Sequence, residues 1–224
     1  PFLCGATLIA VKKKDGGVRP IAVGEVFRRL ASKCVMSCVS KQATETLTPL
    51  QVGVGTPLGC EAIVHSVRSI LDSTNIPPDE KWVLTIDFRN AFNLVDRTEM
   101  FAAFRERIPA ASAWLESSYA SQPLLRFGEE TIHSSTGVQQ GDPLGPLGFA
   151  LTLHKLVERI SLEVPELRMN SWYLDDGTLC GKPDDLNKAW TIIMDDSPGL
   201  GLQVNNKKCL LYIPHGDDTP NPLP

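Results

Sequence analysis

The sequence predicts an α+β fold with a mostly antiparallel sheet and helices on one face. Two observations support this: short apolar runs with strand spacing lie between turn residues, and longer amphipathic stretches have helical spacing. The 224 residues are 42% hydrophobic and 21% charged, which is enough for one sizeable core or for one domain with a smaller subdomain. No apolar run reaches the roughly 18 residues of a membrane span, so no membrane partner is expected.

The first eighty residues predict a hairpin followed by two helices. Strand-like runs at 7–11 and 18–23 flank a turn at 12–17 that is rich in lysine and glycine. A helix is expected over residues 26–45, with an apolar stripe of Val26, Leu30, Cys34 and Met36. A loop at 48–59 follows, and the next helix carries the stripe Ile63, Val67, Ile70 and Leu71.

The remaining chain alternates strands and helices. We expect a strand at 81–88, helices at 97–107 and 111–120, and a hairpin of 124–127 with 130–134. The next helix has Asp142 as its N-cap and Pro143 at its first position, and it runs to 160. Two strands within 171–180 around a turn at Asp175-Asp176-Gly177, a helix at 185–196 and a strand at 209–213 follow. The tail from Pro214 is expected to be irregular. The chain starts at Pro1 without a methionine and shows no signal peptide, so we expect a piece of a longer protein.

The charge of the chain is uneven. A net charge of −4 and a pI of about 5.6 count against a nucleic-acid-binding protein, which usually has a basic face. However, the first 41 residues hold eight Lys and Arg against two acidic residues, and the acids gather in later segments. Six cysteines without a CxxC pair predict reduced thiols in an intracellular protein, in the nucleus or the cytoplasm, and not a zinc site.

Three acidic residues stand out by their apolar surroundings. Of four Asp-Asp pairs, only Asp175-Asp176 lies at the tip of an apolar hairpin, where mutual repulsion and partial desolvation favour a bound divalent cation over a plain exposed turn. Asp87 ends an apolar strand, and alternation puts it on the same face as Val83 and Thr85. If the hairpin lies beside this strand, three carboxylates converge as ligands for two magnesium ions about 4 Å apart.

Five short motifs then occur in a recognisable order. They are Arg19-Pro20-Ile21 after the lysines at 12–14, Asp87-Phe88-Arg89-Asn90-Ala91-Phe92, Gln140-Gly141-Asp142-Pro143-Leu144-Gly145-Pro146, Tyr173-Leu174-Asp175-Asp176, and Gly201-Leu202-Gln203-Val204-Asn205-Asn206-Lys207-Lys208. Each motif alone is weak, but their order and separation over nearly the whole chain are specific. In these motifs the sequence resembles reverse transcriptases, most closely those of non-LTR-type retroelements.

The resemblance implies the fingers and palm of a right-hand polymerase, with the thumb absent. The fingers would comprise residues 1–45, a connecting helix 46–80, the palm 81–213 and an irregular tail 214–224. The implied activity is RNA-directed DNA polymerisation, which adds dNTPs to a primer 3′-OH by two-metal phosphoryl transfer. The implied partners are an RNA or DNA template, a primer strand and dNTPs, and flanking domains of a longer polyprotein are expected.

The resemblance also assigns roles to individual residues. Asp87 and Asp175 would hold two Mg²⁺ ions, with Mn²⁺ as an alternative, helped by the backbone carbonyl of Phe88 and by Asp176 as a weaker ligand. Arg19 would contact the incoming triphosphate, and Lys13, or else Lys12 or Lys14, its γ-phosphate. Gln140 and Gly141 would shape the pocket under the nascent base pair. Phe92 would act as a steric gate against the ribose 2′-OH, and Lys208 would protonate the leaving pyrophosphate.

Blander interpretations stay open for several of these residues. The alternative for Phe92 is a core phenylalanine at a helix entry, and for the 12–14 lysines a solvated turn. The alternative for Gln140 and Gly141 is a helix-entry turn, and for Lys208 a surface lysine. Two other functions also compete: an RNA-dependent RNA polymerase, and an inactive, domesticated palm that only binds nucleic acid or a protein. The first usually has a second Asp five residues after Asp87, where this chain has Phe92. Many reverse transcriptases have Asp where this chain has Asn93, a position that is not a metal ligand.

Overall fold

The computed structural model describes residues 4–12 and 16–214 of the chain. The chain divides into two compact units, Pro1–Thr46 with Asn90–Thr152 and Leu47–Arg89 with Leu153–Pro224. The functional limits expected at residues 45, 80 and 213 come from the resemblance and stay predictions. No helix in the described part of the chain is long and apolar enough to cross a membrane.

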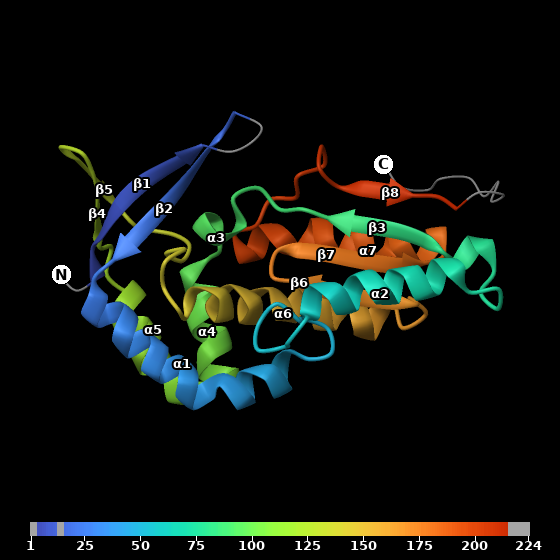
Figure 1. Cartoon of the computed structure of the whole chain (residues 1–224), viewed down its shortest axis with the longest axis horizontal. Helices are drawn as coiled ribbons and strands as arrows, with labels where there is room; N and C mark the ends of the chain where they lie inside the picture. Colours follow the sequence, from blue (N-terminus) through green and yellow to red (C-terminus); the bar gives the residue numbers. More distant parts are fainter. Residues whose placement is uncertain (1–3, 13–15, 215–224) are drawn as a thin grey trace. The chain divides into compact units, whose positions relative to one another are not determined.

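The first unit contains a four-stranded sheet in the order β2-β1-β4-β5 (Figure 1). Its strands are β1 (Ala6–Lys12), β2 (Val18–Gly24), β4 (Leu124–Phe127) and β5 (Glu130–His133). β1 and β2 pair antiparallel, as do β4 and β5, whereas β1 runs parallel to β4. Both predicted hairpins are therefore confirmed. The sequence analysis did not predict that the two hairpins form one sheet, in which β1 pairs with β4 from a distant part of the sequence.

Helices form the rest of this unit. They are α1 (Val26–Leu47), α3 (Ala91–Leu94), α4 (Arg97–Arg107), α5 (Pro109–Tyr119) and the first half of α6 (Gly145–Glu163). Asp96 caps α4 by accepting a hydrogen bond from the Glu99 backbone N–H at 3.0 Å, and Pro109 opens α5, where a missing N–H costs nothing. The unit's core includes the fully buried side chains of Met100, Phe104, Ile108, Leu115, Leu147 and Phe149.

Two local expectations for this unit are wrong, and one short helix was missed. The stripe predicted for α1 is not its buried face: Val26 and Leu30 are exposed, and the buried positions of the helix are Arg28, Ser32, Val39, Ala43 and Leu47. Helix α6 begins at Gly145 and not at Pro143. One oxygen of Asp142 does accept from the Leu144 backbone N–H at 3.0 Å, but this bond closes a turn ahead of the helix. The short helix α3 was not predicted.

The second unit contains an antiparallel sheet in the order β6-β7-β3-β8 (Figure 1). Its strands are β3 (Trp82–Ile86), β6 (Met169–Tyr173), β7 (Asp176–Gly181) and β8 (Leu210–Tyr212). The 171–180 hairpin lies beside the strand that precedes Asp87, which the sequence analysis had stated only as a condition. Its turn is shifted, however: Tyr173 pairs with Asp176, so Leu174 and Asp175 form the turn and Asp176 already belongs to β7.

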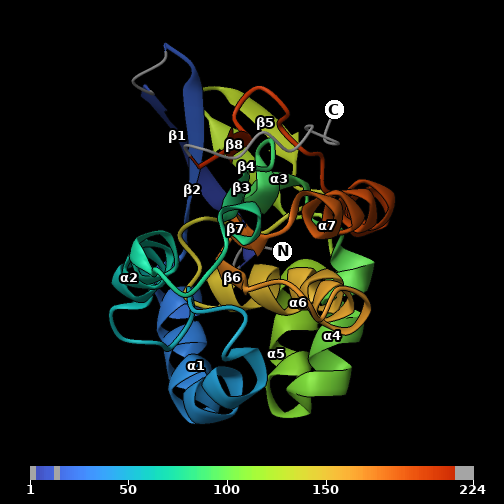
Figure 2. The same cartoon turned by 90° about the vertical axis from the view of Figure 1, so that its right-hand side faces the viewer.

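Helices cover both faces of this sheet. Helix α2 (Gly59–Asp72) packs its predicted stripe of Ile63, Val67, Ile70 and Leu71 against Val83, Met169 and Cys180. On the opposite face, the Asn170 side chain donates to the Val157 carbonyl of α6 at 3.1 Å. Figure 2 shows α2 on one side of the sheet and α7 (Pro183–Asp196) on the other. The expectation of helices on one face was thus incomplete. Two 3₁₀ turns, η2 (Pro78–Glu80) and η3 (Ser197–Leu200), complete the unit.

Candidate active site

The carboxylates of Asp87 and Asp176 meet at one end of the second unit's sheet. Ile86 pairs with Gly177 in the β3–β7 ladder, so the same register puts Asp87 opposite Asp176. Paired residues of antiparallel strands share a face, and Thr85 with Thr178 continues this face along the sheet. The alternation inferred from the sequence is therefore confirmed for Asp87.

The electrostatics of this pair favour a cation. Partial burial raises the pKa of Asp176 above its ordinary value, the negative charge of Asp87 raises this pKa further, and Lys208 acts in the opposite direction. Two carboxylates that repel each other beside a lysine match the chemistry of a divalent-cation site, because a bound cation removes the repulsion. The charge of Lys208 thus acts on Asp176 from the 201–208 segment.

The predicted group of three carboxylates, Asp87, Asp175 and Asp176, stays a prediction. Among the residues that the structure describes, no cluster of three or more His, Cys, Asp or Glu side chains is placed to hold a metal ion. Asp175 is half-buried in the two-residue turn, whereas the strand ladder aligns Asp176 with Asp87. The relative strength of Asp175 and Asp176 as ligands stays a prediction.

Asn205, in the segment between η3 and β8, donates two hydrogen bonds to Asp87. Its side-chain Nδ2 donates to Asp87 Oδ1 at 2.8 Å, and its backbone N–H donates to the Asp87 carbonyl, also at 2.8 Å. The Arg89 N–H donates to the Gln203 carbonyl at 2.8 Å, which completes an isolated bridge between Phe88 and Val204. The sequence analysis included Asn205 in a motif but gave it no role. A polar residue three positions before Lys208 was the available signal.

The hairpin tip is held by Gln51, a residue that the sequence analysis missed. Leu174 has a left-handed backbone with φ of 55°. The buried Gln51 side chain accepts from the Leu174 N–H at 2.7 Å and donates to the Leu174 carbonyl at 3.0 Å. Gly53 lies against the same tip, where an added Cβ would come within 2.6 Å of the Leu174 nitrogen. No pattern in the 48–59 loop indicated this contact.

Phe88 has its side chain and its carbonyl in different environments. The buried Phe88 ring stacks on Trp172, with ring centroids 6.1 Å apart. The bridge described above uses the backbone groups of Asp87 and Arg89 and not those of Phe88. The predicted metal-ligand role of the Phe88 carbonyl is therefore compatible with the bridge.

The basic residues expected to bind phosphate lie in the first unit. Arg19 is exposed on β2 and pairs with Val11 of β1. Lys12, at the end of β1, is exposed as well. Lys13, together with Lys14, lies outside the described residues. Arg19 is thus available to an anion, in agreement with its predicted role.

Gln140 and Gly141 lie in a turn whose flanking residues, Gln139 and Asp142, belong to a buried polar network. Arg28 donates to Asp142 Oδ2 at 2.8 Å and to Gln139 Oε1 at 3.0 Å, and the Tyr119 hydroxyl donates to Asp142 Oδ2 at 2.9 Å. We call these four residues, Arg28, Tyr119, Gln139 and Asp142, the Arg28 network. Burial, and then the charge of Asp142, raise the pKa of Tyr119, which keeps its hydroxyl protonated as a donor. The sequence analysis missed Arg28 and Tyr119.

Gly141 approaches the strand that carries Arg19. A Cβ added to Gly141 would lie 2.8 Å from the Ala22 carbonyl oxygen of β2. The turn therefore needs glycine here, because a side chain would push the turn off the strand. Gln140 itself is half-buried. The structure thereby brings Gly141 close to the backbone of β2, in line with a shared pocket.

Phe92 is the second residue of helix α3 and is half-buried. Its ring stacks on the fully buried ring of Phe149, with centroids 4.6 Å apart and an interplanar angle of 17°. The side chain therefore has a core partner and also an accessible part. Both interpretations given above, the core phenylalanine and the steric gate, are compatible with this position.

A model of the family described as "Reverse transcriptase (RNA-dependent DNA polymerase)" matches residues 11–218. The chain belongs to the reverse transcriptase family. The match covers all five motifs from which the resemblance was inferred, so that inference is confirmed. The reverse transcriptase motifs supply the paired carboxylates, the Asn205 contact and the turn at Gln140.

Known relatives agree with this assignment. The retrotransposable element SLACS 132 kDa protein of Trypanosoma brucei gambiense is 28% identical over 215 residues, or 91% of this chain. Apo telomerase of Candida tropicalis superposes with a TM-score of 0.65 and 12% identity over 98% of this chain. The telomerase of Candida albicans, in complex with a fragment of telomeric RNA, superposes with a TM-score of 0.70 and 12% identity over 96% of this chain. These similarities confirm the α+β polymerase fold. The chain spans 17% of the SLACS protein and 52% and 42% of the two telomerase chains.

Proposed function

We propose that this chain carries the catalytic core of an RNA-directed DNA polymerase, which adds dNTPs to a primer 3′-OH. The observation that carries the proposal is the alignment of Asp87 with Asp176 at the end of the sheet, beside Lys208, in a member of the reverse transcriptase family. Paired carboxylates in this chemistry hold the cations that stabilise charge on phosphoryl oxygens. By analogy with the SLACS protein, the parent protein would belong to a retroelement and act inside the cell, in the nucleus or the cytoplasm.

The metal ligands would be Asp87, Asp175, Asp176 and the carbonyl oxygen of Phe88. Two Mg²⁺ ions bound there would stabilise the attacking and leaving oxygens of the transfer, and Mn²⁺ would be an alternative. The charge repulsion between Asp87 and Asp176 supports this assignment, since it leaves a demand for positive charge that Lys208 only partly meets. Lys208 would also give a proton to the departing pyrophosphate.

The first unit would bind the incoming nucleotide. Arg19 would contact the triphosphate with its guanidinium, helped by Lys13, while Gln140 and Gly141 would line the pocket under the nascent base pair. The Arg28 network would keep that pocket in shape, because its hydrogen bonds fix both sides of the 139–142 turn. Template and primer strands, RNA or DNA, would be the macromolecular partners.

The activity and the sugar choice can be tested in one assay. We expect primer extension on an RNA template with dNTPs and Mg²⁺, and little extension with NTPs. The exposed part of the Phe92 ring should exclude a 2′-OH, so Phe92→Val should raise NTP use relative to dNTP use by about tenfold or more, as expected when a steric contact worth about 1–3 kcal/mol is removed.

Phe149→Leu is the matched control, because it removes the buried ring on which Phe92 stacks. An unchanged sugar preference in a folded Phe92→Val chain would assign this ring to the core. Efficient NTP extension by the unmodified chain would favour an RNA polymerase, and no extension with either nucleotide would favour the inactive, binding-only palm.

Asn205 should matter for metal binding. We expect Asn205→Ala to weaken Mn²⁺ binding about 10–100-fold, as is typical for residues that orient a ligand, while the chain stays folded. Titration followed by electron paramagnetic resonance measures this without any turnover. Asn206→Ala is the matched control, because the neighbouring amide is exposed and no hydrogen bond joins it to Asp87. Equal affinities of the two variants would show that Asn205 does not position Asp87.

A further inference from the structure

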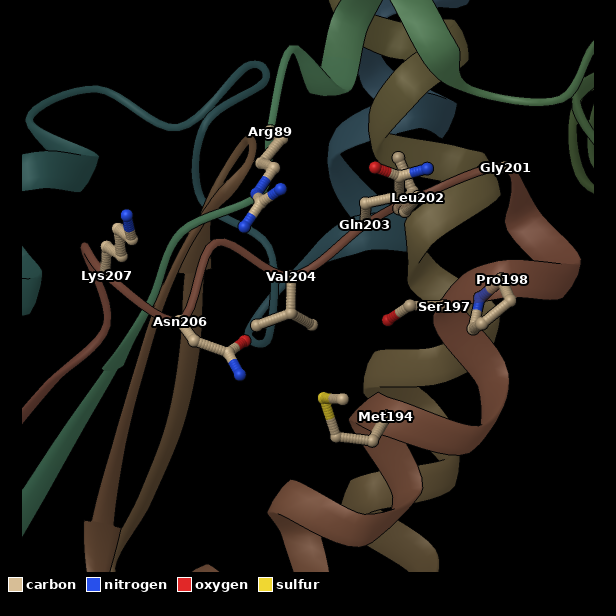
Figure 3. Close-up of a pocket in the computed structure, with 10 residues that line it drawn as sticks. All are labelled: Arg89, Met194, Ser197, Pro198, Gly201, Leu202, Gln203, Val204, Asn206 and Lys207. Carbon is tan, nitrogen blue, oxygen red and sulfur yellow. The ribbon is translucent and has the colours of Figure 1, made fainter. Parts of the chain in front are cut away.

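A pocket in the second unit is lined by residues to which the proposed function gives no role. It has a volume of about 630 Å³ and lies between the 201–207 segment and the end of α7 with η3 (Figure 3). Its walls include Arg89, Lys207, Met194 and Val204. Its volume falls within the range of about 300–1,000 Å³ that is usual for small-ligand sites.

The charges of this pocket indicate an anionic ligand. Arg89 and Lys207 are both exposed, and neither side chain has a hydrogen bond or ion pair with another residue in the described part of the chain. In Figure 3 their charged ends lie on the same side of the pocket. Among the described residues, no Asp or Glu lines the pocket. Two unpaired cations without a neighbouring carboxylate create a local positive potential in a chain whose net charge is −4.

The other walls indicate that the ligand is larger than a simple anion. Opposite the two cations lie Met194 and Pro198, and Val204 and Leu202 add apolar surface. Methionine is adaptable and makes favourable contacts with the edge of aromatic rings. Met194 is 41% exposed, although most of its thioether side chain is apolar. A flat apolar group seated on this wall would cover it while an attached anion reached Arg89 and Lys207.

We propose that this pocket binds a nucleoside phosphate, with the phosphate on Arg89 and Lys207 and the base against Met194 and Val204. The ligand is either a free nucleotide or a terminal nucleotide of a strand, since both present the same chemistry. The pocket is lined by Arg89 and Val204, which flank the bridge that holds Asp87. A ligand there contacts the support of the candidate active site and does not itself require the metal-binding carboxylates.

The four methionines of the chain allow a direct test that needs no catalytic turnover. Met194 is the one methionine that lines this pocket, whereas Met100 and Met169 are buried elsewhere. The chain is labelled with ¹³C-methyl methionine and titrated with deoxyadenosine 5′-monophosphate in EDTA, which keeps metal-dependent binding out. The Met194 resonance, assigned with Met194→Leu, should shift saturably while the other three stay in place.

The charged residues supply the second arm of the test. The double variant Arg89→Gln/Lys207→Gln should weaken binding about tenfold, because two charge-assisted contacts to phosphate are lost. Lys182→Gln, which removes an exposed charge that pairs with Glu80 outside the pocket, should leave the affinity unchanged. The three remaining methionine signals report whether each variant is folded. Titration with a 5′-phosphorylated oligonucleotide then distinguishes a strand end from a free nucleotide by its relative affinity.

Three outcomes would overturn the proposal. The first is a Met194 signal that neither the mononucleotide nor the oligonucleotide shifts. The second is inorganic phosphate binding as tightly as the nucleotide, since the apolar wall would then contribute nothing. The third is unchanged affinity in the double variant. None of them bears on polymerase activity, so the proposed function is tested separately.

Discussion

Replacing Asp87 by Asn should reduce primer extension by at least about a thousandfold while leaving the fold intact. The change keeps the shape of the side chain and the oxygen that accepts from Asn205, but it removes the negative charge opposite Asp176. Electrostatic stabilisation of charge in the transition state is commonly the largest contribution to catalysis, and a single donor group contributes about 10²–10³-fold. Loss of a metal ligand should cost at least as much.

The measurement is single-turnover extension of a primer on an RNA template, with circular dichroism to verify folding. Asp175→Asn should give a similar loss if Asp175 is a ligand, as the resemblance implies. Asp195→Asn is the matched control, because this acid lies near the end of α7 and away from β3 and β7 in the sequence. Comparable losses at Asp87 and Asp195 would contradict the assignment of the site.

Asp142→Ala should destabilise the first unit by about 3–5 kcal/mol. Arg28 and Asp142 form an ion pair whose side chains are only 2% and 3% exposed, so the variant leaves an unpaired guanidinium in the interior. The Arg28 Nε is already buried without a hydrogen-bond partner, and the network has no spare acceptor for it among the described residues. In a chain of this size the loss corresponds to a fall in Tm of about 10 °C.

A double variant separates the charge from the packing. Arg28→Met with Asp142→Leu removes both charges, and it should recover much of the stability, because well-packed apolar pairs replace buried ion pairs at little cost. Urea denaturation of the two single variants and the double variant gives the coupling energy directly. Additive losses would show that the pair does not act as a unit. The double variant should still bind dNTP poorly, since the turn at Gln140 would lose its hydrogen bonds to Arg28.

The sequence predicted the sheet at the candidate site better than it predicted the first unit. Alternation along the strand at 82–86 predicted the face of Asp87, and the apolar runs around Gly177 predicted the 171–180 hairpin, which the structure pairs with that strand. Those elements obey local rules, because each strand is short, apolar and bounded by turn residues. Helix α2 also packs its predicted stripe against the sheet, and those four residues are partly buried there.

The failures come from contacts that no local pattern contains. The apolar period of α1 suggested the wrong face, because the helix buries Arg28 for its hydrogen bonds with Gln139 and Asp142, more than a hundred residues later. Asn205 and Gln51 were missed for the same reason: each acts on a residue far along the chain. The turn was placed one residue late because an Asp-Asp-Gly sequence favours a turn, whereas Gln51 stabilises the left-handed Leu174.

The contact between Gln51 and the hairpin tip limits where this chain can be lengthened. Connecting loops usually accept inserted residues, and the 48–59 segment has the glycines and prolines of such a loop. Yet an insertion between Gln51 and Gly53 would separate the amide that holds Leu174 from the glycine that packs beside it. The β4–β5 turn at Gly128 has no atom within 4 Å of an added Cβ, so a peptide tag or a length difference among homologues belongs there. The loop before α2 therefore supports the candidate active site, although none of the predicted catalytic groups lies in it.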